Sequence, residues 1–302
     1  MSYFTERHGL RAPVERTEKM TLEMYSVIYD CCEKYYENIS WKYPEECPDG
    51  NGCCGMDYQK FSTAITFEIP TLFKNQNGKL DKPRRDYYDR EDTFDQFALL
   101  DLIELIYAES KDISNRYWHS YYRHDDISFT NTKGCSTIFK KEINEIFDKT
   151  GLLYKLSDFG MVERVVLNSP LTKDIEAKVA QVSEKGTREL LEDAILLYKT
   201  PAPAARNDAV EKIWDALERL KTYYITLDKK KSIEKIVLDM ANGKQEFATV
   251  FNDEFVALTK IGNNFRIRHH ETDKIEITDA RYYDYFFNRC LSLVALAIQY
   301  LM

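Results

Sequence analysis

The densest group of chemically active side chains lies in residues 263–274, NNFRIRHHETDK. The groups that could act on a phosphodiester are Arg266, Arg268, His269, His270 and Glu271. Arginine presents a planar fork of donors to phosphate oxygens, and histidine can carry a proton near neutral pH. Together they suit RNA cleavage in which the 2′-hydroxyl attacks its own phosphate and no metal is needed. The alternative is a set of ion pairs at a helix end, with Glu271 and Asp273 neutralising the cations.

A second basic point is the stretch LDKKKSIEK, residues 227–235. Asp228 suits the cap position before a helix. Lys229, Lys230 and Lys231 would then occupy the first helical turn, where the helix dipole disfavours positive charge. This placement indicates contact with a polyanion such as RNA, and the alternative is an ordinary solvated helix face.

A third group, NRYWHSYYRHDD, contains His119, Tyr122 and His124 among other aromatic residues. We expect a packed, hydrogen-bonded aromatic corner here. Two alternatives stay open. The histidines could bind a divalent metal together with Asp125 and Asp126, or the aromatic rings could stack on single-stranded bases.

Five of the seven cysteines lie between Cys31 and Cys54. The odd count, in a chain whose N-terminus has no apolar export signal, argues against a disulfide framework. A zinc site can be drawn from Cys31, Cys32, Cys47, Cys53 and Cys54. However, five residues separate Cys47 from Cys53, more than in a usual zinc knuckle. The chain also has no glycine-rich phosphate loop, so we expect neither a metal nor another cofactor.

The chain of 302 residues is long enough for two domains, and its formal net charge of −8 excludes a general basic coat for nucleic acid. No apolar run is long enough to cross a membrane. We therefore expect a cytoplasmic protein with no membrane contact.

In the first half, apolar spacing predicts helices over 21–41, 94–113 and 138–150, and a helix passing into a strand over 57–73. Loops are expected over 43–55 and 74–92, and a loop with short elements over 114–136. Two short strands, LLYKL and MVERVV, follow the 138–150 helix and are joined by a turn that closes at Gly160. This order is typical of the back half of a winged-helix unit.

The second half is almost entirely helical in pattern. Helices are expected over 173–182, 187–199, 205–224, 229–242, 244–261 and 279–301. Such a run with short connections indicates a helical bundle. The fold class is therefore mainly α, with an α+β module over residues 1–170 and a helical bundle over residues 171–302.

Six stretches, in this order, resemble a known family: FALLDLIELI, RYWHSYYRHDDISF, EINEIFDKTGLLYKLSDFGMVERVV, AVEKIWDALERLKTYY, LDKKKSIEKI and IGNNFRIRHHETDK. They resemble bacterial proteins that carry the fourth class of AbiJ N-terminal domain, named for abortive-infection phage resistance. The C-terminal helices are similar to HEPN domains, which are small bundles found in prokaryotic toxins and immunity effectors. Many HEPN domains are metal-independent ribonucleases that pair to build one site from two copies.

The resemblance implies an antiphage endoribonuclease in which His269 is the general base or acid and His270 a second proton carrier. Arg266 and Arg268 would stabilise the phosphorane, and Glu271 would orient the histidine. Contacts to RNA are expected from Lys229, Lys230, Lys231, Asn263 and Asn264. The expected partners are RNA, a second copy of the chain, and a partner protein or antitoxin.

This sequence departs from the HEPN signature, which places four to six residues between arginine and histidine. Two residues separate Arg266 from His269. A non-catalytic sensor or adaptor that binds RNA or a protein is therefore the alternative.

Overall fold

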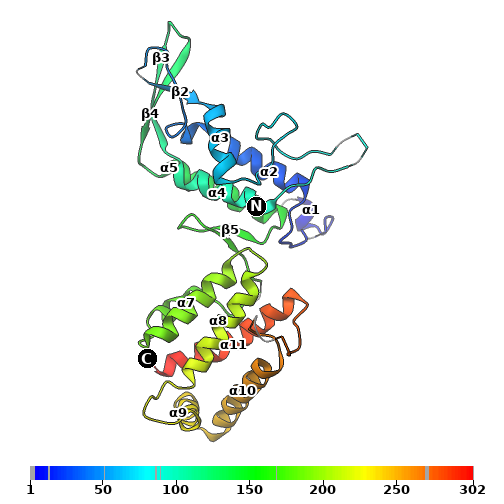
Figure 1. Cartoon of the computed structure of the whole chain (residues 1–302), viewed down its shortest axis with the longest axis vertical. Coiled ribbons are helices and arrows are strands. Elements are labelled where there is room, and N and C mark those ends of the chain that lie inside the picture. Colours follow the sequence, from blue (N-terminus) through cyan, green and yellow to red (C-terminus); the bar gives the residue numbers. More distant parts are fainter. Residues whose placement is uncertain are drawn as a thin grey trace. The chain divides into compact units, whose positions relative to one another are not determined.

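The structure is a computed structural model that describes residues 4–12, 14–50, 52–85, 87–88, 90–167, 169–268 and 272–301. Packing divides the chain into two units that meet in the sequence at Val165 and Val166, and each unit has its own apolar core. The chain is mainly helical (Figure 1). Among the residues that the structure describes, no helix is both long and apolar enough to cross a membrane.

The first unit combines helices with a small antiparallel sheet. Its helical elements are α1 (Phe4–Arg7), α2 (Leu22–Glu33), η1 (Glu37–Ile39), α3 (Tyr58–Glu68), α4 (Gln96–Glu109) and α5 (Gly134–Thr150). Its sheet runs in the order β1-β2-β4-β3, with β1 (Pro44–Glu46), β2 (Cys53–Met56), β3 (Asp112–His119) and β4 (His124–Thr130). The most apolar helix is α4, which contacts both α2 and α5 and buries Leu99, Ile103 and Ile106 between them.

The β3–β4 hairpin corrects the loop with short elements expected over 114–136, and Figure 1 shows its two strands side by side. Seven residue pairs join the two strands, ending with His119 opposite His124. Most of β3 is exposed on both faces, including Tyr117 and Trp118. The alternation of apolar and polar residues that marks a half-buried strand is therefore missing.

Three other sequence expectations in this unit were wrong. The 57–73 segment is helical to Glu68 and then turns, without a strand. Asp57 fixes the start of α3 by accepting from the backbone N–H groups of Gln59 and Lys60. The 43–55 segment contains β1 and β2 rather than a loop alone. The helix expected over 21–41 ends at Glu33, and a short 3-10 turn, η1, follows.

The hairpin expected after α5 is confirmed. Strands β5 (Tyr154–Leu156) and β6 (Val162–Arg164) pair antiparallel, with Leu156 opposite Val162. Helix α5 ends at Gly151, which has φ of 80°. A Cβ atom there would lie 2.2 Å from the Glu15 carbonyl oxygen, so the position requires glycine. That this helix and hairpin form a winged helix stays a prediction.

The second unit is the expected run of helices. They are α6 (Lys173–Ala180), α7 (Lys185–Lys199), α8 (Ala205–Leu220), α9 (Lys229–Ala241), α10 (Gln245–Asn264) and α11 (Ala280–Leu301). Helix α8 is central, contacting α7 and α11, and buries Ile213, Trp214 and Leu217. Gly262 of α10 allows close packing here, because a Cβ atom would lie 2.6 Å from the Trp214 indole Nε1.

Candidate functional site

The loop that follows α10 carries the arginines singled out in the sequence, and hydrogen bonds close its base. Helix α10 ends at Asn264, three residues beyond the end predicted from the sequence. The Arg266 N–H donates to the Ile275 carbonyl (2.8 Å), and the Ile275 N–H donates to the Asn264 carbonyl (3.0 Å). Ile267, between the two arginines, is buried. The backbone on both sides of this loop is therefore fixed against the C-terminal end of α10.

The cations of this loop face different surroundings. Arg268 Nη2 lies 2.8 Å from Asp215 Oδ1 on α8, and both side chains keep about a third of their surface exposed (28% and 35%). Lys274 Nζ donates to the Gly262 carbonyl at the end of α10 (3.1 Å). Burial raises the pKa of Tyr283, and the nearby positive charge of Arg266 opposes that rise. His269, His270 and Glu271 lie outside the described residues.

The lysines in the first turn of α9 are placed as the sequence predicted, with Asp228 as the helix cap accepting from the Lys231 N–H (2.9 Å). Their side chains differ in their partners. Lys229 Nζ lies 2.7 Å from Glu218 Oε2, and Lys231 Nζ lies 3.4 Å from Asp228 Oδ2. These two charges are therefore partly neutralised within the chain.

Lys230 instead lines a cavity of about 330 Å³ between α9 and α10. Lys260, Asn252 and Thr259 of α10 line the same cavity. Lys260 and the exposed Asn264 are four residues apart on one helix, so they share a face. The face of α10 that carries Lys260 thus continues to Asn264, at the start of the loop that carries Arg266 and Arg268.

A buried lysine holds this part of the bundle together. Lys221 is only 1% exposed, and its ammonium lies 2.5 Å from Glu218 Oε1 and 2.8 Å from Thr259 Oγ1 of α10. Because Glu218 also pairs with Lys229, one carboxylate links the end of α8 to the start of α9. The pKa of Glu218 is lowered: burial opposes the shift, but the hydrogen bonds from the two lysines outweigh it. This network positions the cavity wall.

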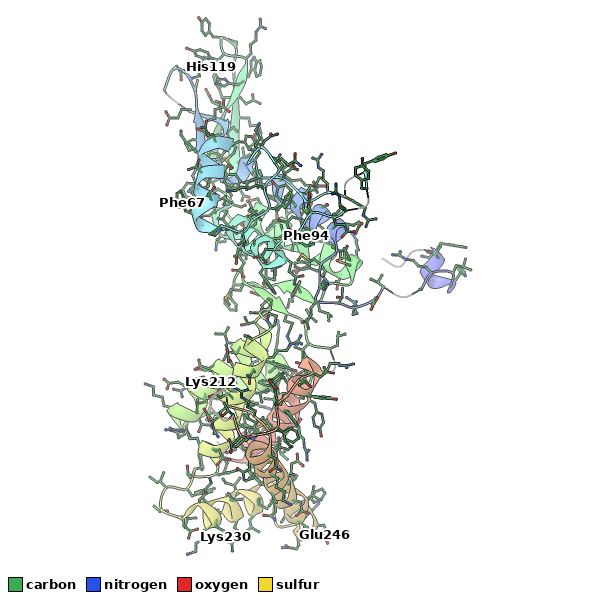
Figure 2. All side chains as sticks on the ribbon, turned by 45° about the vertical axis from the view of Figure 1, so that its right-hand side comes forward. Phe67, Phe94, His119, Lys212, Lys230 and Glu246 are labelled. Carbon is green, nitrogen blue, oxygen red and sulfur yellow. The ribbon has the colours of Figure 1, made fainter. Side chains whose placement is uncertain are left out.

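The aromatic corner expected around His119 lies at the outer end of the β3–β4 hairpin, where Figure 2 labels His119. The Tyr122 ring lies 4.9 Å from the His119 ring and 5.9 Å from the His124 ring, between centroids. The two histidine rings stack at 5.7 Å. The three residues named from the sequence are therefore brought together.

Side chains from the turn between β1 and β2 reach the same place. His124 Nε2 lies 3.3 Å from Cys47 Sγ and 3.3 Å from Asp126 Oδ1. His119 Nε2 lies 3.2 Å from Asp49 Oδ2. Shielding from water, together with the neighbouring Asp49 carboxylate, raises the pKa of the Cys47 thiol to about 11.

The other cysteines of the sequence-drawn zinc set take up separate positions. Cys31 and Cys32 are buried in α2, in the core of the first unit, and burial raises their pKa. Cys54 Sγ contacts the Glu45 carbonyl (3.3 Å). In the described part of the chain, the donors that converge are Cys47, His119 and Asp126, a mixed set that cysteine spacing alone could not reveal.

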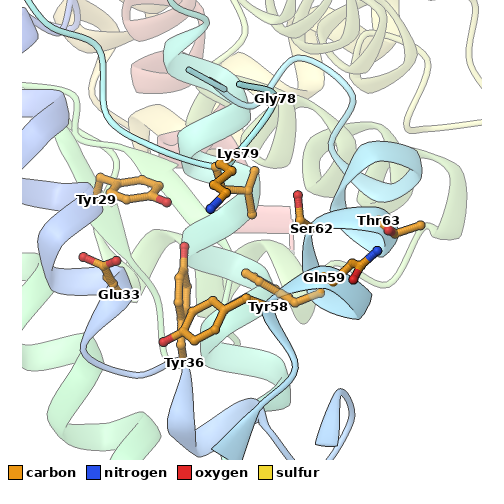
Figure 3. A pocket seen from close by; sticks show the side chains of 11 residues that line it. Tyr29, Glu33, Tyr36, Tyr58, Gln59, Ser62, Thr63, Gly78 and Lys79 are labelled. Atoms are coloured by element: carbon orange, nitrogen blue, oxygen red, sulfur yellow. The ribbon is translucent and has the colours of Figure 1, made fainter. Parts of the chain in front are cut away.

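A cavity of about 620 Å³ in the first unit, between α2, α3 and the loop near Gly78, was not predicted from the sequence. Figure 3 shows Tyr29, Tyr36 and Lys79 directed toward one another across it. Burial raises the pKa of Tyr29 to about 12, so its hydroxyl stays protonated at neutral pH. This lining of hydroxyl, ammonium and aromatic groups could hold a small polar ligand.

Comparison with known proteins gives one assignment. The sequence profile described as AbiJ N-terminal domain 4 matches residues 2–181, more than half of the chain. The match spans the first unit and extends through α6. No curated protein and no solved structure matches the chain. The resemblance read from the sequence is thus confirmed for the N-terminal part, and the chain belongs to the AbiJ N-terminal domain 4 family.

Proposed function

We propose that this protein acts in antiphage defence by abortive infection and that its C-terminal unit is a HEPN-type endoribonuclease that needs no metal. Membership of the AbiJ family supports the defence role. The observation that carries the nuclease proposal is the loop after α10, whose base is closed by backbone hydrogen bonds and which carries Arg266 and Arg268, the arginines that precede His269 in the sequence.

In this mechanism, His269 takes the proton from the RNA 2′-hydroxyl, whose oxygen then attacks the adjacent phosphorus. Arg266 and Arg268 stabilise the charge on the phosphorane oxygens. His270 gives a proton to the departing 5′-oxygen, and Glu271 orients the His269 ring. The products are a 2′,3′-cyclic phosphate and a 5′-hydroxyl end.

RNA would approach along the cavity between α9 and α10, where Lys230 and Lys260 supply positive charge. Asn263 and Asn264 are exposed at the end of this path and can donate to phosphate or base oxygens. Lys229 and Lys231 contribute less, because Glu218 and Asp228 pair with them. A second copy of the chain would complete the site, as in paired HEPN domains.

The test is cleavage of total RNA by the purified full chain, with and without EDTA. Wild type is compared with His269→Ala, and His8→Ala is the matched control, because His8 is an exposed histidine of the other unit. We expect wild type and His8→Ala to give fragments ending in cyclic phosphate in both buffers, and His269→Ala to give none. Equal cleavage by His269→Ala would overturn the assignment of the base.

Lysine substitutions test the RNA path. Lys230→Ala with Lys260→Ala should weaken RNA binding and flatten its salt dependence, because two phosphate contacts are lost. Lys185→Ala is the control, since that lysine is exposed on α7 and pairs with Glu189 on its own helix. Binding is measured by fluorescence anisotropy over a range of salt concentrations.

A non-catalytic adaptor is the second candidate, and the Arg268–Asp215 ion pair favours it. An arginine already bonded to a carboxylate has fewer donors left for phosphate. Under this proposal the loop is structural, and the bundle binds a protein partner, an antitoxin or uncleaved RNA. Binding of RNA without cleavage by wild type would favour the adaptor over the nuclease.

A further inference from the structure

A cluster of metal-binding side chains in the first unit lies apart in sequence from every residue of the proposed nuclease. One ligand atom each of Cys47, His119 and Asp126 lies within 4.8 Å of the other two. His124 Nε2 is 3.3 Å from two of these residues, at Cys47 Sγ and Asp126 Oδ1. The Cys47 thiol and the Asp126 carboxylate are thus approached by two imidazoles.

The pairing of β3 with β4 puts three of these side chains on one face. His119 is directly opposite His124, and Tyr117 is directly opposite Asp126. Opposed residues share a face, and so do alternate residues of one strand. His119, His124 and Asp126 therefore project to the same side, whereas Asp125 projects to the other.

The turn between β1 and β2 brings the cysteine to this face. Cys47 is 2% exposed, and its N–H donates to the Gly52 carbonyl (2.9 Å), which closes the turn. Gly52 permits the approach, because a Cβ atom there would lie 3.2 Å from Asp126 Oδ1. The site is therefore assembled from two hairpins.

Hydrogen bonding within the chain leaves this cluster incomplete. Asp126 Oδ1 is shielded from water and accepts no hydrogen bond from the described residues, although His124 Nε2 lies nearby. One imidazole N–H cannot serve both Asp126 and Cys47 at once. A buried carboxylate oxygen without a donor is unfavourable, and a bound cation would satisfy it together with the sulfur.

We propose that Cys47, His119, His124 and Asp126 bind a zinc ion that fixes the β1–β2 turn to the end of the β3–β4 hairpin. Zinc accepts sulfur, nitrogen and oxygen ligands in tetrahedral geometry at about 2.0–2.3 Å, which places ligand atoms about 3.3–3.8 Å apart. The distances from His124 to Cys47 and Asp126 already have this length. With four protein ligands the site is closed and structural.

The first measurement is the metal content of the purified full chain by mass spectrometry, followed by titration of the chelator-stripped protein with Zn²⁺ and with Co²⁺. We expect about one zinc ion per chain. We also expect the cobalt form to show the visible bands of a tetrahedral ion and a thiolate-to-metal charge-transfer band. A wild-type chain that is purified without zinc and does not take up Zn²⁺ or Co²⁺ would overturn the proposal.

Two matched pairs of variants locate the site. Cys47→Ser and Asp126→Asn should lose the zinc, whereas Cys54→Ser and Asp125→Asn should keep it, since these neighbours lie outside the cluster. Circular dichroism checks the folding of each variant, and the charge-transfer band of the wild type tests cysteine ligation without any substitution. Equal zinc content in all four variants would refute this ligand set. These results are independent of RNA cleavage, so the zinc site and the nuclease can fail separately.

Discussion

At the scale of single residues, Arg268 is the position where the two proposed functions make different demands. Its ion pair with Asp215 is partly exposed, so it contributes little to stability, about 1 kcal/mol or less. The same ion pair fixes the position of the Arg268 guanidinium, and Arg268 directly precedes His269 in the sequence. The observed geometry of Arg268 is therefore compatible both with binding phosphate and with a purely structural link to α8.

Asp215→Asn separates these demands, because it removes the charge and keeps the side-chain shape. We expect the melting temperature to fall slightly and the affinity for RNA to rise, since Arg268 gains donors for phosphate. Asp253→Asn, at an exposed position of α10, is the control. Thermal unfolding and anisotropy measure the two effects, and unchanged RNA affinity would count against a phosphate role for Arg268.

Gly262 makes a second prediction at this scale. Alanine is favoured over glycine inside a helix by about 1 kcal/mol. Here its Cβ would lie 2.6 Å from Trp214 Nε1, so α10 would have to move away from α8. We expect Gly262→Ala to destabilise the second unit by about 1–3 kcal/mol, as overpacking does. Lys260 is exposed two residues earlier on the same helix, so Lys260→Ala should change the stability of the second unit little. Urea unfolding measures the stability of both variants.

At the scale of elements, α5 depends on a cap that comes from another strand. Its own cap position, Lys133, makes no side-chain bond to the helix. Instead Asp112 of β3 accepts from the N–H groups of Gly134 (2.9 Å) and Cys135 (2.5 Å). The bond from the Thr132 hydroxyl and these two N–H groups lower the pKa of Asp112 to about 2. The start of the helix is thus fixed to the sheet.

This cap predicts a pH dependence. The pKa of Asp112 is lower in the folded chain than its usual value of 3.8. The stability that the ionised Asp112 cap supplies is therefore fully present above about pH 4 and is lost as the pH falls toward 2. Asp112→Ala should reduce the free energy of unfolding by about 1 kcal/mol at neutral pH and by less in acid. Asp148→Ala, at the other end of α5, should not destabilise the helix, because an anion is unfavourable there. Urea unfolding at several pH values tests both.

The elements also explain what the sequence could and could not predict. Helices such as α8 and α10 were predicted because their buried residues recur with helical spacing. The β3–β4 hairpin was missed because exposed residues on both faces leave no alternating pattern. The lysines in the first turn of α9 and the loop after α10 were identified because each group is continuous in sequence. The meeting of Cys47 with His119 and Asp126 depends on strand pairing between distant segments, which composition and spacing do not encode.

At the scale of the whole molecule, the two units have separate cores, and each should unfold as its own cooperative transition. Calorimetry of the full chain should therefore show two transitions. Ile103→Ala, in the first core, should lower the temperature of one transition, and Leu217→Ala, in the second core, should lower that of the other. Each substitution should reduce the free energy of unfolding of its unit by about 2–5 kcal/mol. A single transition that both substitutions lower equally would show that the units unfold together.

The strand order β1-β2-β4-β3 also has a consequence for synthesis of the chain. Strands β1 and β2 are translated early and can pair at once, but β2 finds its other neighbour only when β4 has left the ribosome, after α3, α4 and β3. Until then the nascent chain carries an open strand edge, which is the kind of surface on which newly made chains associate with one another. We therefore expect ribosome-bound fragments that stop before His124 to be the most prone to aggregate and the most dependent on chaperones.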